Sequence, residues 1–418
     1  MKFPLFRTAG RVDRSGVVRS LLLGLCLLLA VVPGYAAQPA WVGTWATSPI
    51  LDNNKDATTP ALTDATLRQV VRVSTGGKKL RLRVSNAFGR SGLVIASAAV
   101  GLATDGSALS AATSVALSFG GQPGVVVPAG AIMLSDPLEF SLPPMADVAV
   151  TLQLKEVPEA ITGHPGARAT SWWRKTADAT PENGAQAAVT RWYFITGIEV
   201  ETDTKPRAVV LLGDSITDGY GVKPGTHQRW TDELSRRLRA NPATADIGVL
   251  NHGIGGNRLL RDGVGPNMLA RFDRDVLVQS GARWVIVQAG INDIGTRLEA
   301  RKHGEPFASA EEIIAAYGQL IERAHLQGLR IIGTTITPYA GADFYWSADG
   351  EADRQTVNAW IRSAGHFDAV IDFDAALRDP ESPARLAPAF DSGDHLHPSM
   401  AGYAEMARVV DLGLFAPL

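Results

Sequence analysis

The chain has 418 residues, of which 45% are hydrophobic and 20% are charged, a composition typical of a folded globular protein. Its 40 Lys and Arg residues nearly balance its 42 Asp and Glu residues, and no block of like charge stands out. This balance makes nucleic acid and anionic membrane surfaces poor candidates as binding partners.

The first 36 residues have the pattern of a secretory signal peptide. Basic residues that include Lys2 and Arg7 precede an unbroken apolar run at 21–32, and small residues end at Ala36, where a signal peptidase would cut. The apolar run is shorter than the ~20 residues that a membrane span needs. The single cysteine, Cys26, lies in this run, so the mature chain is expected to lack disulfides and thiol chemistry. We therefore expect an exported bacterial protein, periplasmic or extracellular, with no stable membrane span after cleavage.

Residues 40–200 alternate apolar and polar side chains with a period of two, as strands with one buried face do. Two such runs, 67–73 and 80–85, are joined across a Gly-Gly pair, which predicts a β-hairpin with Arg81 and Arg83 on its solvated face. Further strand candidates are 93–100, 125–127, 132–134, 148–154 and 192–200. Gly and Pro clusters separate them, so we predict an all-β sandwich or jelly-roll-like accessory domain over 40–200.

A polar stretch at 201–206 ends in proline, and we place a domain boundary there. Beyond it, short apolar strands alternate with apolar residues at helical spacing. The strand candidates are 209–212, 247–250, 284–287, 331–336 and 369–371, and the helix candidates are 230–238, 313–324, 357–364 and 403–410. This alternation predicts an α/β domain over 207–418, in which helices cover both faces of a parallel sheet.

Polar loops follow the strands of this predicted sheet. Ser215 directly follows the first strand, and three further loops lie at 251–257, 288–293 and 391–398. Because the carboxyl ends of parallel strands share one edge of a sheet, where ligands bind, we expect these loops to converge.

The four loops contain the groups that acyl transfer needs. A serine hydroxyl such as that of Ser215 is a weak nucleophile until an imidazole takes its proton, and a carboxylate must orient that imidazole. His397 and Asp394, three residues apart, can supply both. Backbone N–H groups of Ser215 and Gly256 and the amide of Asn292 are candidate donors to the oxyanion.

The sequence resembles the SGNH or GDSL hydrolases, a family of esterases and lipases, in four motif blocks within 207–418. The blocks are Gly213-Asp214-Ser215 with Thr217 and Gly219, Gly256 within 251–257, Gly290-Ile291-Asn292-Asp293, and Asp394-His395-Leu396-His397. The resemblance implies Ser215 as nucleophile, Gly256 and Asn292 as oxyanion donors, Asp394 as orienting carboxylate and His397 as base. It also implies a flavodoxin-like α/β/α domain that hydrolyses carboxylic esters with no metal or cofactor. Asp214 and Asp293 we interpret as carboxylates that stabilise turns or caps.

Residues 70–89 are similar to a two-domain secreted subgroup of this family, which includes xylan esterases and arylesterases. This similarity implies a small-molecule or polysaccharide ester as substrate, with a short acyl group such as acetyl. Three alternatives remain open: a lipase or arylesterase, an acyltransferase with the same triad, and a carbohydrate-binding protein on an inactive scaffold. A metal site at Asp391, Asp394, His395 and His397 is disfavoured, because no further ligand motif completes it.

Overall fold

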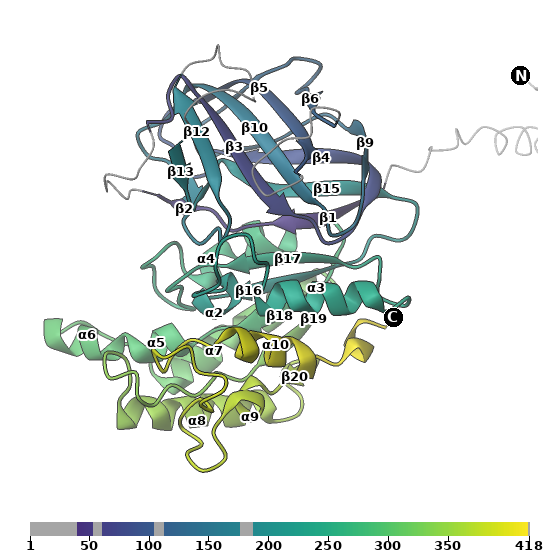
Figure 1. The fold of residues 1–418 in the computed structure, drawn as a ribbon. Coiled ribbons are helices and arrows are strands. Elements are labelled where there is room, and N and C mark those ends of the chain that lie inside the picture. The colour runs from purple at the N-terminus through teal and green to yellow at the C-terminus, as the bar shows by residue number, and fades with distance from the viewer. Residues whose placement is uncertain (1–39, 53–60, 104–112, 176–186, 417–418) are drawn as a thin grey trace, which may run out of the picture. The chain divides into compact units, whose positions relative to one another are not determined.

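The computed structural model describes residues 40–52, 61–103, 113–175 and 187–416 (Figure 1). The predicted signal peptide, 1–36, lies outside the described residues.

Antiparallel strands occupy the described chain up to Thr202. One sheet has the order β1 (Ala40–Ala46), β15 (Ile195–Thr202), β4 (Gly77–Ser85) and β8 (Ile132–Leu134), and β9 (Leu138–Leu142) also pairs with β4. A second sheet has the order β13 (Ala187–Val189), β12 (Ser171–Lys175), β3 (Ala65–Arg72), β10 (Asp147–Glu156), β5 (Leu93–Leu102) and β6 (Val115–Leu117), with β7 (Val125–Val127) on β5. Short strands β14 (Trp192–Tyr193), β11 (Thr162–His164) and β2 (Ile50–Leu51) form a third sheet.

The two larger sheets bury one apolar core, which confirms the predicted all-β part. Leu80 and Leu82 of β4 lie in the same buried cluster as Val150 and Leu152 of β10, and all four side chains are fully buried. Residues that alternate along each strand thus face the other sheet, as in a sandwich.

The predicted hairpin does not form. β3 pairs with β10 and β12, whereas β4 pairs with β15, β8 and β9, so the chain passes from one sheet to the other between them. A Cβ atom on Gly76 would lie 2.3 Å from the carbonyl oxygen of Leu142, so this glycine permits close backbone approach. Since both sheets bury one face, the alternating pattern is the same for a hairpin and for a crossing between sheets.

The expectation that Arg81 and Arg83 lie on a solvated face is wrong for Arg83, whereas Arg81 is partly exposed. Both guanidinium groups lie 2.5 Å from the carboxylate of Glu199 on β15, and Arg83 is only 9% exposed. Arg83 Nη1 also donates to Gln279 Oε1, 3.4 Å away in the part of the chain beyond residue 207. Arg83 therefore contacts the second part of the protein from this face of the sheet.

The second part is built on a parallel sheet with the order β17 (Gly248–Gly253), β16 (Ala208–Gly213), β18 (Ala282–Gln288), β19 (Arg330–Thr334) and β20 (Ala369–Ile371). Val210 in β16 lies opposite Leu250 and Val285 on its two neighbours. This strand order is that of flavodoxin-like folds, as the sequence predicts.

Helices connect these strands. They are α2 (Ser215–Asp218), α3 (Trp230–Ala240), α4 (Met268–Phe272), a π-helix η1 (Asp273–Leu277), α5 (Ile291–Gly295), α6 (Arg297–His303), α7 (Ala310–Leu326), α8 (Ala348–Arg362), α9 (Phe373–Leu377), α10 (Met400–Val409) and a 3-10 helix η2 (Leu412–Phe415). No helix within the described ranges is long and apolar enough to span a membrane.

The helices cover both faces of the parallel sheet. Val209 of β16 packs in a cluster with residues of α3 and α10, which lie side by side in Figure 1. The next residue, Val210, packs in the other cluster, with residues of α4 and α7. Each inner strand is therefore apolar on both faces, which explains the continuous hydrophobic runs in its sequence.

The β-rich part contacts the edge strand β17. Ser74 Oγ accepts a hydrogen bond from Val249 N (2.9 Å), and Gly43 N donates to Ser280 O (2.9 Å). The bond to Val249 brings the β-rich part to β17, whose carboxyl end leads into the loop that contains Gly256, while Ser280 precedes β18.

Candidate active site

Ser215 stands at the carboxyl end of the central strand. β16 ends at Gly213, and the carboxylate of Asp214 caps α2 by accepting a hydrogen bond from Ile216 N (2.9 Å). Ser215 is the first residue of this helix, and its side chain is largely buried, with 7% of the residue exposed. Burial raises the pKa of Asp214 to about 7. In the described chain, the carboxyl group of Asp214 bonds to Ile216 and Gln288 and not to the Ser215 hydroxyl. Asp214 is thus a helix cap, as the sequence indicates.

The loop before α10 brings an imidazole and a carboxylate to this serine. Ser215 Oγ lies 2.9 Å from His397 Nε2, and His397 Nδ1 lies 2.7 Å from Asp394 Oδ2. Backbone N–H groups of Leu396 and His397 donate to the other carboxylate oxygen of Asp394, at 3.0 and 2.8 Å. The three side chains form one continuous line of hydrogen bonds.

The charges of this line are set by burial and by hydrogen bonds. Desolvation opposes the charge of Asp394, but hydrogen bonds from His397 and Leu396 outweigh it and lower the pKa of Asp394 to about 2. Burial also lowers the pKa of His397 below its ordinary value, although Asp394 acts in the opposite direction. At neutral pH the arrangement is therefore a carboxylate beside a neutral imidazole, which can accept a proton from the serine.

A tyrosine that the sequence analysis missed holds the plane of this imidazole. The rings of Tyr220 and His397 stack with centroids 4.0 Å apart and 26° between their planes. The carbonyl oxygen of Tyr220 accepts a hydrogen bond from the buried hydroxyl of Tyr403 (2.9 Å), which anchors the loop after α2. An aromatic residue shortly after a helix carries no sequence signal for such a role.

The candidate oxyanion donors lie on adjacent loops. Gly256 follows β17 with a positive φ of 71°, and its N–H donates no hydrogen bond to any described residue. Asn292 lies in the first turn of α5, where its Nδ2 donates to Asn257 O (2.9 Å) and its Oδ1 accepts from the Tyr345 hydroxyl (2.8 Å). One N–H of the Asn292 amide is left for a ligand, since an amide nitrogen carries two hydrogens.

Asp293 joins the same two loops. Its buried carboxylate accepts hydrogen bonds from Leu259 N (2.9 Å) and Leu260 N (3.2 Å), which follow the Gly256 loop. Burial raises the pKa of Asp293 to about 6. The sequence interpretation of Asp293 as a structural carboxylate agrees with this geometry, but the turn that it stabilises belongs to another loop.

Residues of the β-rich part reach α2 and β17. His164 Nε2 lies 3.0 Å from Asp218 Oδ1 at the end of α2, and His164 Nδ1 lies 2.8 Å from Ser48 O. Ser48 Oγ in turn lies 2.9 Å from His252 Nδ1, and burial lowers the pKa of His252 to about 3. His252 is thus a buried, neutral histidine, and His164 joins Ser48 to the end of α2.

Arg271 is the buried centre of this junction. Its guanidinium donates to Ser48 Oγ (2.8 Å), to Gly213 O (2.9 Å) and to Asn257 Oδ1 (3.0 Å), and it pairs with Asp275 (3.0 Å). One side chain thereby connects the β-rich part with the residues that precede Ser215 and follow Gly256.

The residues considered as metal ligands form two separate pairs. His395 Nδ1 lies 2.5 Å from Asp391 Oδ2, while His397 Nδ1 pairs with Asp394. Over the ranges that the structure describes, no group of three or more His, Cys, Asp or Glu side chains could hold a metal ion.

The family model for GDSL-like lipases and acylhydrolases matches residues 211–405, which include Ser215, Gly256, Asn292, Asp394 and His397. The chain carries an SGNH hydrolase domain. An acetylxylan esterase of Geobacillus stearothermophilus is 26% identical over 214 residues, which span 48% of this chain and 90% of that protein. The family match and this relative indicate a carboxylic ester hydrolase.

Similar solved structures each match 49% of this chain. A G-D-S-L family lipolytic protein from Desulfitobacterium hafniense is 23% identical, with a TM-score of 0.37, and the match covers 49% of this chain and 99% of that one. A catalytic mutant of an acetylxylan esterase from Geobacillus stearothermophilus is 25% identical, with a TM-score of 0.36, over 49% of this chain and 91% of that one.

Proposed function

We propose that the protein is an exported serine esterase in which Ser215, His397 and Asp394 form the catalytic triad. The observation that carries this proposal is the continuous line of hydrogen bonds from Ser215 Oγ through both ring nitrogens of His397 to Asp394, at 2.9 and 2.7 Å. A nucleophile, a base and an orienting carboxylate in hydrogen-bond contact are the parts of a covalent acyl-transfer mechanism.

The reaction follows from the position of each group. Ser215 Oγ attacks the ester carbonyl while His397 Nε2 takes its proton, and the negative oxygen of the tetrahedral intermediate accepts hydrogen bonds from Ser215 N, Gly256 N and the Asn292 amide. His397 then gives its proton to the leaving alcohol, and an acyl-enzyme remains. Water attacks this ester with His397 again as base, and collapse of the second intermediate releases the acid and restores the serine. Asp394 holds the tautomer that presents Nε2 to the serine.

The proposed substrate is a small or polysaccharide ester with a short acyl group, in particular an acetyl group on a carbohydrate. The similarity to an acetylxylan esterase supports this choice. Export, periplasmic or extracellular, is proposed from the leader at 1–36, and it would give the enzyme access to such polymers.

The decisive experiment for the triad is Ser215→Ala, assayed with p-nitrophenyl acetate. We expect kcat to fall on the order of 10⁴-fold or more, with an unchanged thermal unfolding midpoint. Ser363→Ala is the matched control, because this serine is exposed at the end of α8 and its hydroxyl bonds only to Trp360 O among the described residues. A folded Ser215→Ala variant that hydrolyses the ester at the parent rate would refute the proposal.

The finer claims need separate measurements. Turnover of acetylated xylan, aryl acetates and longer-chain esters should be fastest for an acetyl substrate if the substrate proposal is right. N-terminal sequencing of protein recovered from the periplasm or medium should begin at Ala37, and an intact leader on that protein would contradict the predicted cleavage.

A further inference from the structure

A cavity of about 160 Å³ lies where the β-rich part meets the loop after β17, and we name it the junction groove. The β-rich part contributes Pro165, Gly166 and Arg168, and the second part contributes Gly255 and Val264. The volume is close to that of an engineered protein cavity of about 150 Å³ that binds benzene, so the groove can take a group as large as one ring.

The junction groove borders the site of the proposed reaction. Gly255 directly precedes the candidate oxyanion donor Gly256, and a Cβ atom on Gly256 would lie 3.2 Å from the Val264 side chain. On the opposite wall, a Cβ atom on Gly166 would lie 1.8 Å from a carboxylate oxygen of Asp218, at the end of the helix that Ser215 begins. An ester whose carbonyl oxygen faces Gly256 N can therefore place the neighbouring part of its structure in the groove.

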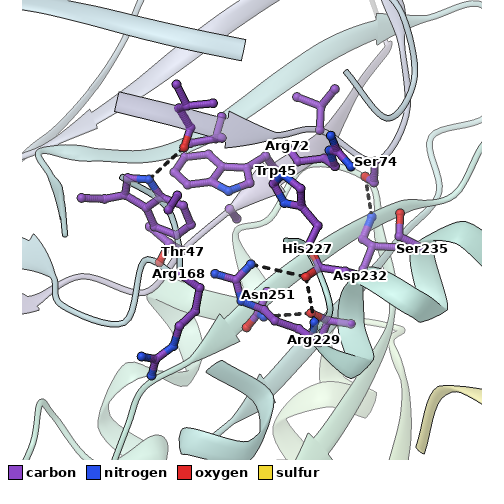
Figure 2. A pocket seen from close by; sticks show the side chains of 18 of the residues that line it. Trp45, Thr47, Arg72, Ser74, Arg168, His227, Arg229, Asp232, Ser235 and Asn251 are labelled. Carbon is purple, nitrogen blue, oxygen red and sulfur yellow. Dashed lines mark hydrogen bonds and ion pairs between the residues drawn. The ribbon is translucent and has the colours of Figure 1, made fainter. Parts of the chain in front are cut away.

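The groove contains an arginine, Arg168, that donates no hydrogen bond to the residues that the structure describes. Arg168 Nε is buried without a hydrogen-bond partner among the described residues, and Asp218 Oδ2, at 3.8 Å from Nη2, is too distant for a hydrogen bond. The other oxygen of Asp218 already bonds to His164 (3.0 Å). In Figure 2 the Arg168 side chain extends away from the other labelled residues. A buried donor without a partner costs free energy, which a bound acceptor would recover.

The backbone fixes where this arginine points. Arg168 has a positive φ of 47°, a conformation that a residue with a side chain adopts at an energetic cost, and its carbonyl accepts a hydrogen bond from Gly225 N (2.9 Å). Its guanidinium carbon lies 5.7 Å from the ring centroid of Tyr220, which stacks on His397. The positive charge is thus held next to the stacked pair that contains the proposed catalytic base.

We propose that the junction groove binds a ring-sized group beside the scissile ester and that Arg168 pairs with a carboxylate on that group. This inference rests on the proposed function. A planar guanidinium with parallel N–H donors matches a carboxylate in two hydrogen bonds, and such charge-assisted bonds are stronger than neutral ones. The carboxylate that faces Arg168 is that of Asp218: its Oδ1 bonds to His164, and its Oδ2 forms an ion pair with Arg168 at 3.8 Å without a hydrogen bond. A substrate carboxylate would supply the hydrogen-bond acceptor that Arg168 lacks among the described residues.

Two pairs of esters test the proposal and locate the carboxylate. In the alcohol arm, 4-acetoxybenzoate is compared with its methyl ester. In the acyl arm, p-nitrophenyl 4-carboxybenzoate is compared with its methyl ester. Each kcat/KM is divided by the rate constant for hydrolysis by hydroxide, which removes differences in intrinsic reactivity. We expect the charged member to be preferred about 10- to 100-fold in one arm, as for a hydrogen-bonded charge pair.

Substitutions then assign the preference to one side chain. Arg168→Met should abolish the ratio of charged to neutral kcat/KM in that arm, and Arg168→Lys should restore part of it. Arg90→Met is the control for loss of one positive charge, because Arg90 is an exposed residue of the same β-rich part, and it should leave the ratio intact.

The outcomes separate this inference from the proposed function. Absence of a preference in both arms of the parent enzyme would overturn the inference even if Arg168→Met did not fold. An equal fall of kcat/KM for the charged and the neutral ester in a folded Arg168→Met variant would also overturn the inference. Such a result would mean that Arg168 only supports Tyr220. Failure of the triad proposal would instead show as a Ser215→Ala variant that retains activity.

Discussion

Replacement of Tyr345 by phenylalanine tests how the Asn292 amide is held. The hydroxyl of Tyr345 donates to Asn292 Oδ1 (2.8 Å), and burial raises its pKa to about 12, so it remains a donor throughout the working range of an esterase. Tyr345→Phe removes this bond and keeps the ring, which occupies the space beside Gly295. Rotation of the Asn292 amide by 180° would exchange the positions of its oxygen and nitrogen. The Tyr345 hydroxyl, which donates to Oδ1, and the Asn257 carbonyl, which accepts from Nδ2, both favour the observed orientation.

The magnitude follows from the number of bonds that remain. One neutral hydrogen bond contributes about 1 kcal/mol net, or roughly a fivefold effect on a rate, whereas removal of a whole oxyanion donor costs about 10²–10³-fold in kcat. Because the bond from Asn292 to Asn257 survives, we expect Tyr345→Phe to lower kcat by about 3- to 10-fold. KM should change little, since the amide acts on charge that develops only in the transition state.

A double-mutant cycle with p-nitrophenyl acetate separates this positioning role from a general loss of structure. In an Asn292→Ala background, Tyr345→Phe should change kcat by less than about twofold, because no amide remains to be oriented. Tyr317→Phe is the matched control, as it removes another buried hydroxyl, which bonds to Ala289 O (2.9 Å). An equal fall of kcat in both backgrounds, or an effect on KM alone, would refute the reasoning.

Four further predictions concern charge. Because burial lowers the pKa of His397 and only its neutral form accepts a proton, the acidic limb of the pH profile of kcat/KM should lie below pH 6.5. Asp394→Asn should move this limb lower, since Asp394 raises that pKa, and should reduce kcat by roughly 10²–10⁴-fold. Burial raises the pKa of Asp214 from 3.8 to about 7, so its contribution to stability is complete below pH 3.8 and is lost as pH rises through about 7. The free energy of unfolding, measured with urea, should therefore fall between pH 4 and pH 8 in the parent. In Asp214→Asn this fall should be smaller by up to roughly 4 kcal/mol. Arg271→Met should lower the free energy of unfolding by about 3–5 kcal/mol, because Asp275 and several buried acceptors lose their partner.

The parallel sheet and the convergence of its loops could be predicted from sequence because their determinants are local. The apolar run at 209–212 is buried on both faces, and its break at Gly213 marks the strand end. The loops that follow parallel strands all lie at the same edge of the sheet, so their convergence follows from the topology. For this reason Ser215 and His397, 182 residues apart, could be expected to meet.

Contacts that depend on three-dimensional packing had no comparable signal. The pattern of β4 reports one buried face and cannot say which strand lies beside it, so the pairing with β3 was wrongly predicted. His164 and Asp218 are 54 residues apart in different parts of the protein, and neither lies in a periodic pattern that would indicate the other. Tyr220 and Tyr345 were missed because an aromatic residue in a loop looks the same whether it packs or positions a reacting group.

The change of sequence pattern at 201–206 marks where the strands change from antiparallel to parallel. Polar contacts nevertheless join the β-rich part before this point to the part that follows it. Arg229, labelled in Figure 2, donates from Nε to Asp218 O (3.0 Å) and from Nη2 to Ala167 O in the β-rich part. His164 satisfies the carboxylate of Asp218, and Ser48 satisfies Arg271. Without the β-rich part these groups would lose partners at the end of the helix that Ser215 begins, and unpaired buried polar groups are costly. We infer that the β-rich part is a structural component of the active site, whatever its contribution to substrate choice.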